Sequence, residues 1–158
     1  DVAYNEFYPQ GLEPVEPNIT RLLDKNNLKW KNMITPGIEI PTLWEKENYD
    51  KMDYAWQKER REMNKHIAEL KRNRVAQKEI NAAQNEYNIK DKTHSDEVDK
   101  YIMGSKYWTK VGSFEGAGYS AKGMYRSMLD CLMFSKGTKP FCKVCEEHVG
   151  KVIKHFAE

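Results

Sequence analysis

The clearest hydrophobic pattern in the chain lies between Trp44 and Asn88. Apolar residues in this range recur at steps of three, four and seven positions, which is the spacing of one helix face. They are Trp56, Met63, Ile67, Leu70, Ile80, Ala83 and Tyr87. The range holds no glycine or proline and is rich in strong helix formers. A polar break near Asn73 predicts that the helix folds back as a hairpin of two helices.

The range 44–100 is therefore expected to be a charged helical arm within a single domain of residues 1–158. Its apolar stripe is narrow and its charges are balanced, which favours a helix with one face against the protein and the other in water. A coiled coil that binds a partner is the alternative.

Shorter patterns precede and follow this arm. Ile19, Leu22 and Leu23 predict a short helix that begins near Asn18 or Thr20. Residues 28–34 predict an apolar turn that ends at Pro36 and Gly37.

After the arm, residues 91–95 predict a polar loop and residues 97–108 a short amphipathic segment. Residues 146–156 predict a C-terminal helix whose apolar face holds Val149, Val152, Ile153 and Phe156. Because no segment alternates convincingly between apolar and polar residues, the expected fold is mainly α with long ordered loops.

A glycine-rich stretch starts at Gly112. Four of the nine glycines of the chain fall between Gly112 and Gly123, interleaved with Phe, Glu and Tyr. Because glycine permits positive φ and close backbone approach, the stretch predicts a shaped loop. Shaped loops with polar groups commonly carry function.

All three cysteines follow this stretch, at Cys131, Cys142 and Cys145, and His148 comes one helical turn after the last of them. Three thiolates and an imidazole are a common ligand set for structural zinc. A disulfide between Cys131 and either of the other two is the rival, and a secreted protein favours it, whereas a cytosolic protein would favour the metal or free thiols. An odd number of cysteines leaves one without a partner in any disulfide within the chain.

The composition of the chain argues against two kinds of binding partner, nucleic acids and the membrane interior. The net charge is only +2 and 39% of the residues are hydrophobic, so we expect a folded protein without a nucleic-acid surface. No apolar run approaches the ~20 residues that span a bilayer, so no membrane span is expected. The chain begins with Asp1 and shows no signal peptide, which leads us to expect a processed or truncated piece.

Motifs of complete active sites are missing from the sequence. The zinc peptidase motif H-E-x-x-H is absent, as is its inverted form, because no two of the four histidines have the required spacing. There is no nucleophile elbow and no phosphate-binding loop. We therefore expect no complete catalytic apparatus within these 158 residues.

Several short motifs resemble one known family. They read Phe-Glu-Gly-Ala-Gly-Tyr, Gly-Met-Tyr-Arg-Ser, Asp-Cys-Leu-Met and Phe-Cys-Lys-Val-Cys. In this order they are similar to the C-terminal signature of the IgA peptidase family of secreted zinc metallopeptidases. Near the N-terminus, Glu-Pro-Val-Glu-Pro-Asn-Ile-Thr and Leu-Lys-Trp-Lys resemble the segment that follows the zinc helix in that family. The similarity covers roughly Gly11–Thr42 and Gly112–Phe156.

The resemblance implies the C-terminal subdomain of a metzincin-like zincin, part of a secreted or extracytoplasmic enzyme. The zinc ligands would lie upstream of Asp1, and the missing N-terminal part of the catalytic domain would be a partner of this chain. The parent enzyme would hydrolyse a protein or peptide substrate with metal-activated water. The 158 residues alone would be inactive.

The resemblance also implies roles for single residues. Met133 would be the methionine of the Met-turn beneath the zinc-binding imidazoles, although ordinary core packing is the simpler interpretation of any methionine. Four residues are candidates for contact with substrate, with purely structural roles as the alternative: Glu115, Tyr119, Tyr125 and Arg126. A non-catalytic helical binding module with a structural cysteine or zinc site is the competing function.

Overall fold

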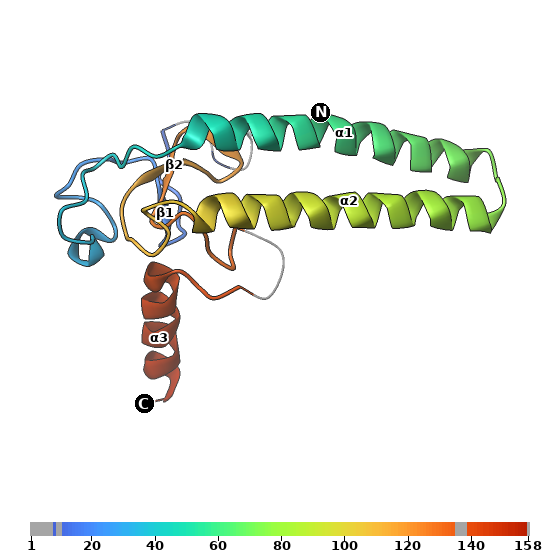
Figure 1. The fold of residues 1–158 in the computed structure, drawn as a ribbon. Helices are drawn as coiled ribbons and strands as arrows, with labels where there is room; N and C mark the ends of the chain where they lie inside the picture. Colours follow the sequence, from blue (N-terminus) through green and yellow to red (C-terminus); the bar gives the residue numbers. More distant parts are fainter. Residues whose placement is uncertain (1–7, 9–10, 135–138, 158) are drawn as a thin grey trace. The chain divides into compact units, whose positions relative to one another are not determined.

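The computed structural model describes residue 8 and residues 11–134 and 139–157 (Figure 1). The chain divides into two compact units. We call residues 45–104 the helical arm, and residues 1–44 together with 105–158 the core unit. Three α-helices and a small three-stranded sheet are found in the described part of the chain, which agrees with the expected mainly α composition. No helix in that part has the length and apolar character needed to cross a membrane.

The helical arm is an antiparallel pair of long helices, α1 (Lys46–Arg72) and α2 (Gln77–Met103), which run side by side (Figure 1). The hairpin predicted from the break near Asn73 is confirmed. Trp56 and Ile67 are buried on α1. Between the helices, the Arg60 Nε donates a hydrogen bond of 3.1 Å to the Tyr87 hydroxyl.

The polar loop expected at residues 91–95 is wrong, because α2 continues through it to Met103. The segment is polar but remains helical, since its polar side chains bond along the helix. Lys92 pairs with Asp96 one turn away at 3.0 Å, and the Thr93 hydroxyl donates to the carbonyl of Ile89.

The core unit holds a sheet in the order β1–β3–β2, with both pairs antiparallel. Its strands are β1 (Ile19–Thr20), β2 (Phe114–Ala117) and β3 (Ser120–Arg126). The prediction of a short helix near Asn18 is therefore wrong, and so is the expectation that the chain has no strand. Residue 19 pairs with residue 126, so β1 forms through a distant partner and not through local sequence.

The glycine-rich stretch is a β-hairpin and not an irregular loop. Its two-residue turn consists of Gly118 and Tyr119, both with positive φ (55° and 63°), as the tight turns that match strand twist require. Gly116, with φ of 100°, lies at an irregularity between Glu115 and Ala117. These glycines interrupt the alternation by which a strand is recognised.

The hydrophobic centre of the core unit joins segments far apart in sequence. Trp30 is buried beside the short 3-10 helix η2 (Lys31–Met33), and its Nε1 donates to the carbonyl of Gly112 at 2.7 Å. The buried residues of this cluster are Leu28, Trp30, Val111, Met128, Cys131, Cys142, Val144 and Cys145. The last two lie at the start of α3 (Lys143–Ala157), which confirms the predicted C-terminal helix.

The segment before β1 is held by Glu13. Its carboxylate accepts hydrogen bonds from the Thr20 hydroxyl (2.5 Å) and the Arg21 amide (2.9 Å), and it pairs with the Lys29 ammonium at 3.0 Å. Burial by itself raises the pKa of Glu13, but these bonds outweigh it and lower the pKa below its ordinary value.

Gly112→Ala should destabilise the core unit by roughly 1–3 kcal/mol, as overpacking does. A Cβ at this position would lie 2.5 Å from the Thr42 Oγ1 and 3.0 Å from the Phe114 ring. Urea unfolding measures the change. Gly150→Ala is the matched control, since its Cβ meets nothing within 4 Å and lies in α3, where alanine is favoured. Equal stability of the two variants would contradict the packing described for Gly112.

Glu13→Gln should lower stability at neutral pH by about 1–2 kcal/mol, because three charge-assisted bonds weaken. A lowered folded-state pKa contributes stability that is present above the ordinary glutamate pKa. That stability is lost as the pH falls through the lowered value, so the difference between variant and native protein should vanish in acid. Unfolding measured from neutral to acidic pH tests this. The control is Glu47→Gln, an exposed residue paired with Lys51, which should change little at any pH. A difference for Glu13→Gln that persisted in acid would contradict the account.

Candidate functional site

The candidate substrate residues of the hairpin do not all face the same surroundings. Tyr119 forms the tip of the β2–β3 turn and is 76% exposed. Arg126, at the end of β3, is buried, and its guanidinium lies over the rings of Trp44 (5.1 Å to the centroid) and Phe134 (5.8 Å). Arg126 is thus held by cation–π contacts inside the core unit.

Glu115 and Tyr125 are brought together as opposite residues of β2 and β3. The Glu115 carboxylate accepts the Gly123 amide at 3.0 Å, and its carbonyl accepts the Trp44 indole N–H at 3.3 Å. Burial, and next the nearby charge of Glu115, raise the pKa of Tyr125. Glu115 therefore fixes the shape of the hairpin.

Met133 lies on a turn that two backbone hydrogen bonds hold in place. The Leu132 amide donates to the carbonyl of Pro140 at 3.0 Å, and the Phe134 amide donates to the carbonyl of Cys131 at 2.8 Å. The Met133 side chain itself is 61% exposed. The Met133 side chain is therefore not packed in the hydrophobic core of this chain.

A buried ion pair fixes the chain just before this turn. The Lys139 ammonium lies 2.7 Å from the Asp130 Oδ2, and both side chains are largely shielded from solvent. The other carboxylate oxygen of Asp130 accepts the Cys131 amide at 2.9 Å. The position of the turn is therefore set by buried charge-assisted bonds.

The three cysteines converge in the core unit. Cys131, Cys142 and Cys145 are buried, and their sulfur atoms all lie within 4.8 Å of one another. All three are free thiols, so the structure contains no disulfide among them. His148 is not part of this group, because its Nδ1 lies 2.9 Å from the carbonyl of Val144, one turn earlier in α3.

The environment of the three thiols differs. The hydrogen bond from the Cys131 thiol, helped by the Cys145 amide, lowers the pKa of Cys142 to about 5. The same bond with Cys142, together with burial, raises the pKa of Cys131. Burial, and then the charge of Cys142, raise the pKa of Cys145 to about 12. Cys142 is thus the group of the three that is favoured as a thiolate.

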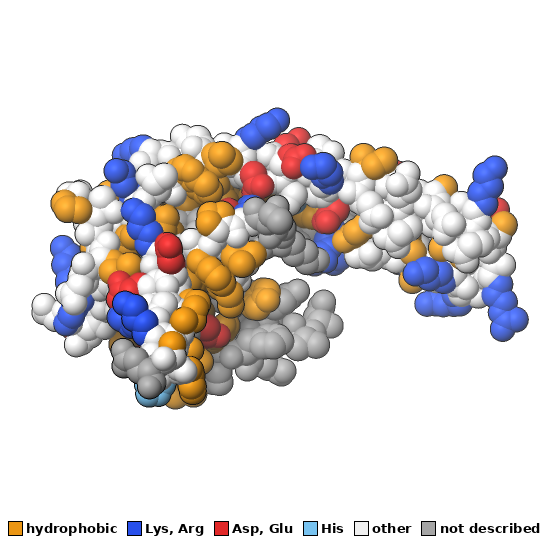
Figure 2. Space-filling model, turned by 90° about the horizontal axis from the view of Figure 1, so that it is seen from below, with side chains coloured by type: hydrophobic (Ala, Val, Ile, Leu, Met, Phe, Trp, Pro, Cys, Tyr) orange, Lys and Arg blue, Asp and Glu red, His pale blue; other side chains and the backbone are white. Residues whose placement is uncertain are grey.

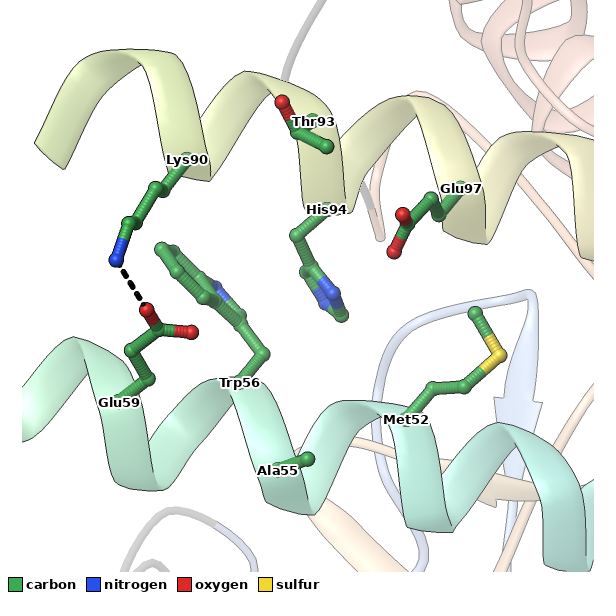
Figure 3. Close-up of a pocket in the computed structure, with 8 residues that line it drawn as sticks. All are labelled: Met52, Ala55, Trp56, Glu59, Lys90, Thr93, His94 and Glu97. Carbon is green, nitrogen blue, oxygen red and sulfur yellow. Dashed lines mark hydrogen bonds and ion pairs between the residues drawn. The ribbon is translucent and has the colours of Figure 1, made fainter. Parts of the chain in front are cut away.

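The helical arm has a pocket of its own, of about 460 Å³, which the sequence interpretation missed (Figure 3). The Trp56 indole and the His94 imidazole stack in it, with ring centroids 5.2 Å apart. Lys90 pairs with Glu59 at 2.6 Å across its edge. In the sequence, the only signal for this pocket was the position of Trp56 on the predicted apolar face. None of its lining residues is a nucleophile hydrogen-bonded to a base.

Comparison with known proteins places the chain. A family model described as IgA Peptidase M64 matches residues 1–153, which is nearly the whole chain. No curated protein gives a significant match. Peptidases of this family are zinc-dependent. The resemblance seen in the motifs of residues 114–145 is confirmed: the chain belongs to the IgA Peptidase M64 family.

Proposed function

We propose that this chain is the C-terminal part of the catalytic domain of a zinc-dependent endopeptidase, where it forms the floor and one wall of the active site. The observation that carries the proposal is Met133. A large apolar side chain is exposed on a turn that hydrogen bonds hold in place, and it lies within the family's signature. A soft thioether on a fixed turn suits the floor beneath metal-binding imidazoles.

The zinc ligands of this proposal lie outside the 158 residues, because H-E-x-x-H does not occur in them. A zinc ion in such a site supplies an activated water and polarises the substrate carbonyl. The residues of this chain help to position the zinc ligands, because the Met133 turn lies beneath them in the proposed site. The metzincin-like fold and the secreted or extracytoplasmic location belong to this same proposal and rest on the family resemblance.

The core unit exposes several apolar residues, which is consistent with a surface that another segment of the protein covers. Hydrophobic side chains reach the surface in several places in Figure 2. Four residues on α3 are exposed, namely Val149, Val152, Ile153 and Phe156, and Leu132 and Phe141 add to them on the flanking chain. Exposed apolar groups of this kind mark surfaces that bind other protein segments. In the proposal, the N-terminal part of the catalytic domain covers some of them.

The hairpin β2–β3 is the proposed wall beside the substrate. Tyr119 at its exposed tip is the residue best placed to contact a peptide. Tyr125 is half-buried beside Glu115 and retains its proton, so it can donate a hydrogen bond. Arg126 holds the hairpin from within the core unit through Trp44 and Phe134.

The competing function is a binding module built on the helical arm. The observation in its favour is that residues 45–104 form a compact unit of their own with a pocket around Trp56 and His94. In the proposed enzyme, the arm is an addition to the peptidase and takes no part in the chemistry.

The intact protein, with the segment upstream of Asp1, should hydrolyse peptides and lose this activity on chelation, with recovery on addition of zinc. The 158 residues alone should hydrolyse none, because the zinc ligands are elsewhere. A peptide library analysed by mass spectrometry measures both. Hydrolysis by the 158 residues alone that a chelator abolishes would contradict the proposal, as would an intact protein whose hydrolysis does not depend on metal.

Met133→Ser should lower kcat/KM of the intact protein by roughly 10–100-fold, the usual effect of losing a group that supports metal ligands. Met133→Leu should retain most of the activity, since it keeps the apolar surface. Met103→Ser is the matched control, because Met103 is 57% exposed at the end of α2, and it should leave the activity unchanged. Equal activities of Met133→Ser and Met103→Ser would contradict the role of Met133.

A further inference from the structure

The three cysteines form a cluster that a disulfide does not explain. A disulfide joins two sulfurs at about 2.05 Å and leaves the third thiol buried without a role. Here each of the three sulfur atoms lies within 4.8 Å of both others. Three thiolates around a tetrahedral zinc lie about 3.8 Å apart, given zinc–sulfur bonds of about 2.3 Å. The observed cluster is close to this arrangement and uses all three cysteines.

Backbone amides point at the sulfurs. The Cys131 Sγ accepts the Cys142 amide at 3.1 Å and also a hydrogen bond from the Met133 amide. The Cys142 Sγ accepts the Cys145 amide at 3.5 Å, and the Ser127 hydroxyl lies 3.6 Å from it. Such donors stabilise negative charge on sulfur and orient metal-binding thiolates.

The start of α3 adds to the same effect. Cys142 directly precedes the first residue of the helix, and its carbonyl accepts the Glu146 amide at 2.9 Å. Cys145 lies in the first turn. The N-terminus of a helix carries partial positive charge, which favours thiolates over thiols. Cys142 and Cys145 therefore both lie at the end of α3 that attracts negative charge.

We propose that Cys131, Cys142 and Cys145 bind one zinc ion, with a lighter atom as the fourth ligand, in a structural site separate from the catalytic metal. Soft thiolate ligands select zinc over magnesium or calcium. Burial of all three sulfurs excludes substrate, so the site has a structural role.

The consequence of this site is to fix Met133. Cys131 precedes the Met133 turn by two residues, and Cys142 and Cys145 belong to the start of α3. One ion would join the turn to the helix at a point where the cluster also contacts Leu28 and Trp30. Metal binding at the cysteines therefore holds the turn that the proposed active site needs.

Cobalt(II) substitution of the intact protein tests the site independently of peptidase activity. A cobalt ion bound by thiolates shows charge-transfer absorption in the near ultraviolet, whereas one bound only by nitrogen and oxygen does not. We expect this absorption in the native sequence, displaced by one equivalent of zinc. We also expect all three cysteines to be alkylated after denaturation without reductant. X-ray absorption of the zinc form should show scattering from sulfur at about 2.3 Å.

Cys142→Ser should lower the zinc affinity of the sulfur site at least 10-fold and weaken the charge-transfer absorption, because one of the three thiolates is lost. Lys151→Ser is the matched control, because it introduces serine on an exposed part of the same helix, and it should leave the absorption unchanged. A disulfide in the native protein with no sulfur-bound metal would overturn the proposal. Three alkylated thiols with no metal uptake would overturn it as well. Neither result would bear on catalytic zinc held by histidines, so failure here is distinguishable from failure of the peptidase proposal.

Discussion

The core unit depends on bonds between two segments that the helical arm separates in sequence. The Trp30 indole donates to the carbonyl of Gly112, and the Thr42 amide donates to the carbonyl of Ser113 at 2.8 Å. The Ser127 amide, after β3, donates to the carbonyl of Asn18 at 3.0 Å, next to β1. Each bond is buried or nearly so, where an unmade bond is costly. These contacts close the core unit across the 60 residues from 45 to 104.

The site follows from that closure. Once Gly112 is fixed against Trp30, the hairpin β2–β3 begins at a defined place, and Glu115 and Trp44 set its outer strand. The chain then returns through buried Ser127 to the cysteines and the Met133 turn. The candidate site residues at the surface are thus held by buried polar bonds, which is how precise geometry is usually obtained for a loop.

The sequence predicted elements whose signal is local and missed those whose cause is distant. The helical hairpin and the C-terminal helix were visible, because their apolar residues repeat with helical spacing. The two residues of β1 carry no signal of their own and pair with Arg126 and Tyr125, more than a hundred positions away. Glycines at the turn and the bulge hid β2 and β3. For the site, cysteine spacing placed Cys142 and Cys145 together, but the approach of Cys131 and the exposure of Met133 depend on the fold of the turn.

We propose that Met133 lies beneath a zinc ion whose ligands come from another part of the same protein. The most direct measurement is anomalous diffraction at the zinc absorption edge from crystals of the intact protein. We expect an anomalous peak from a zinc ion bound by histidines, with the thioether of Met133 packed against their rings. A refined structure in which the Met133 side chain remains in solvent, or packs into a core with no metal beside it, would contradict the account.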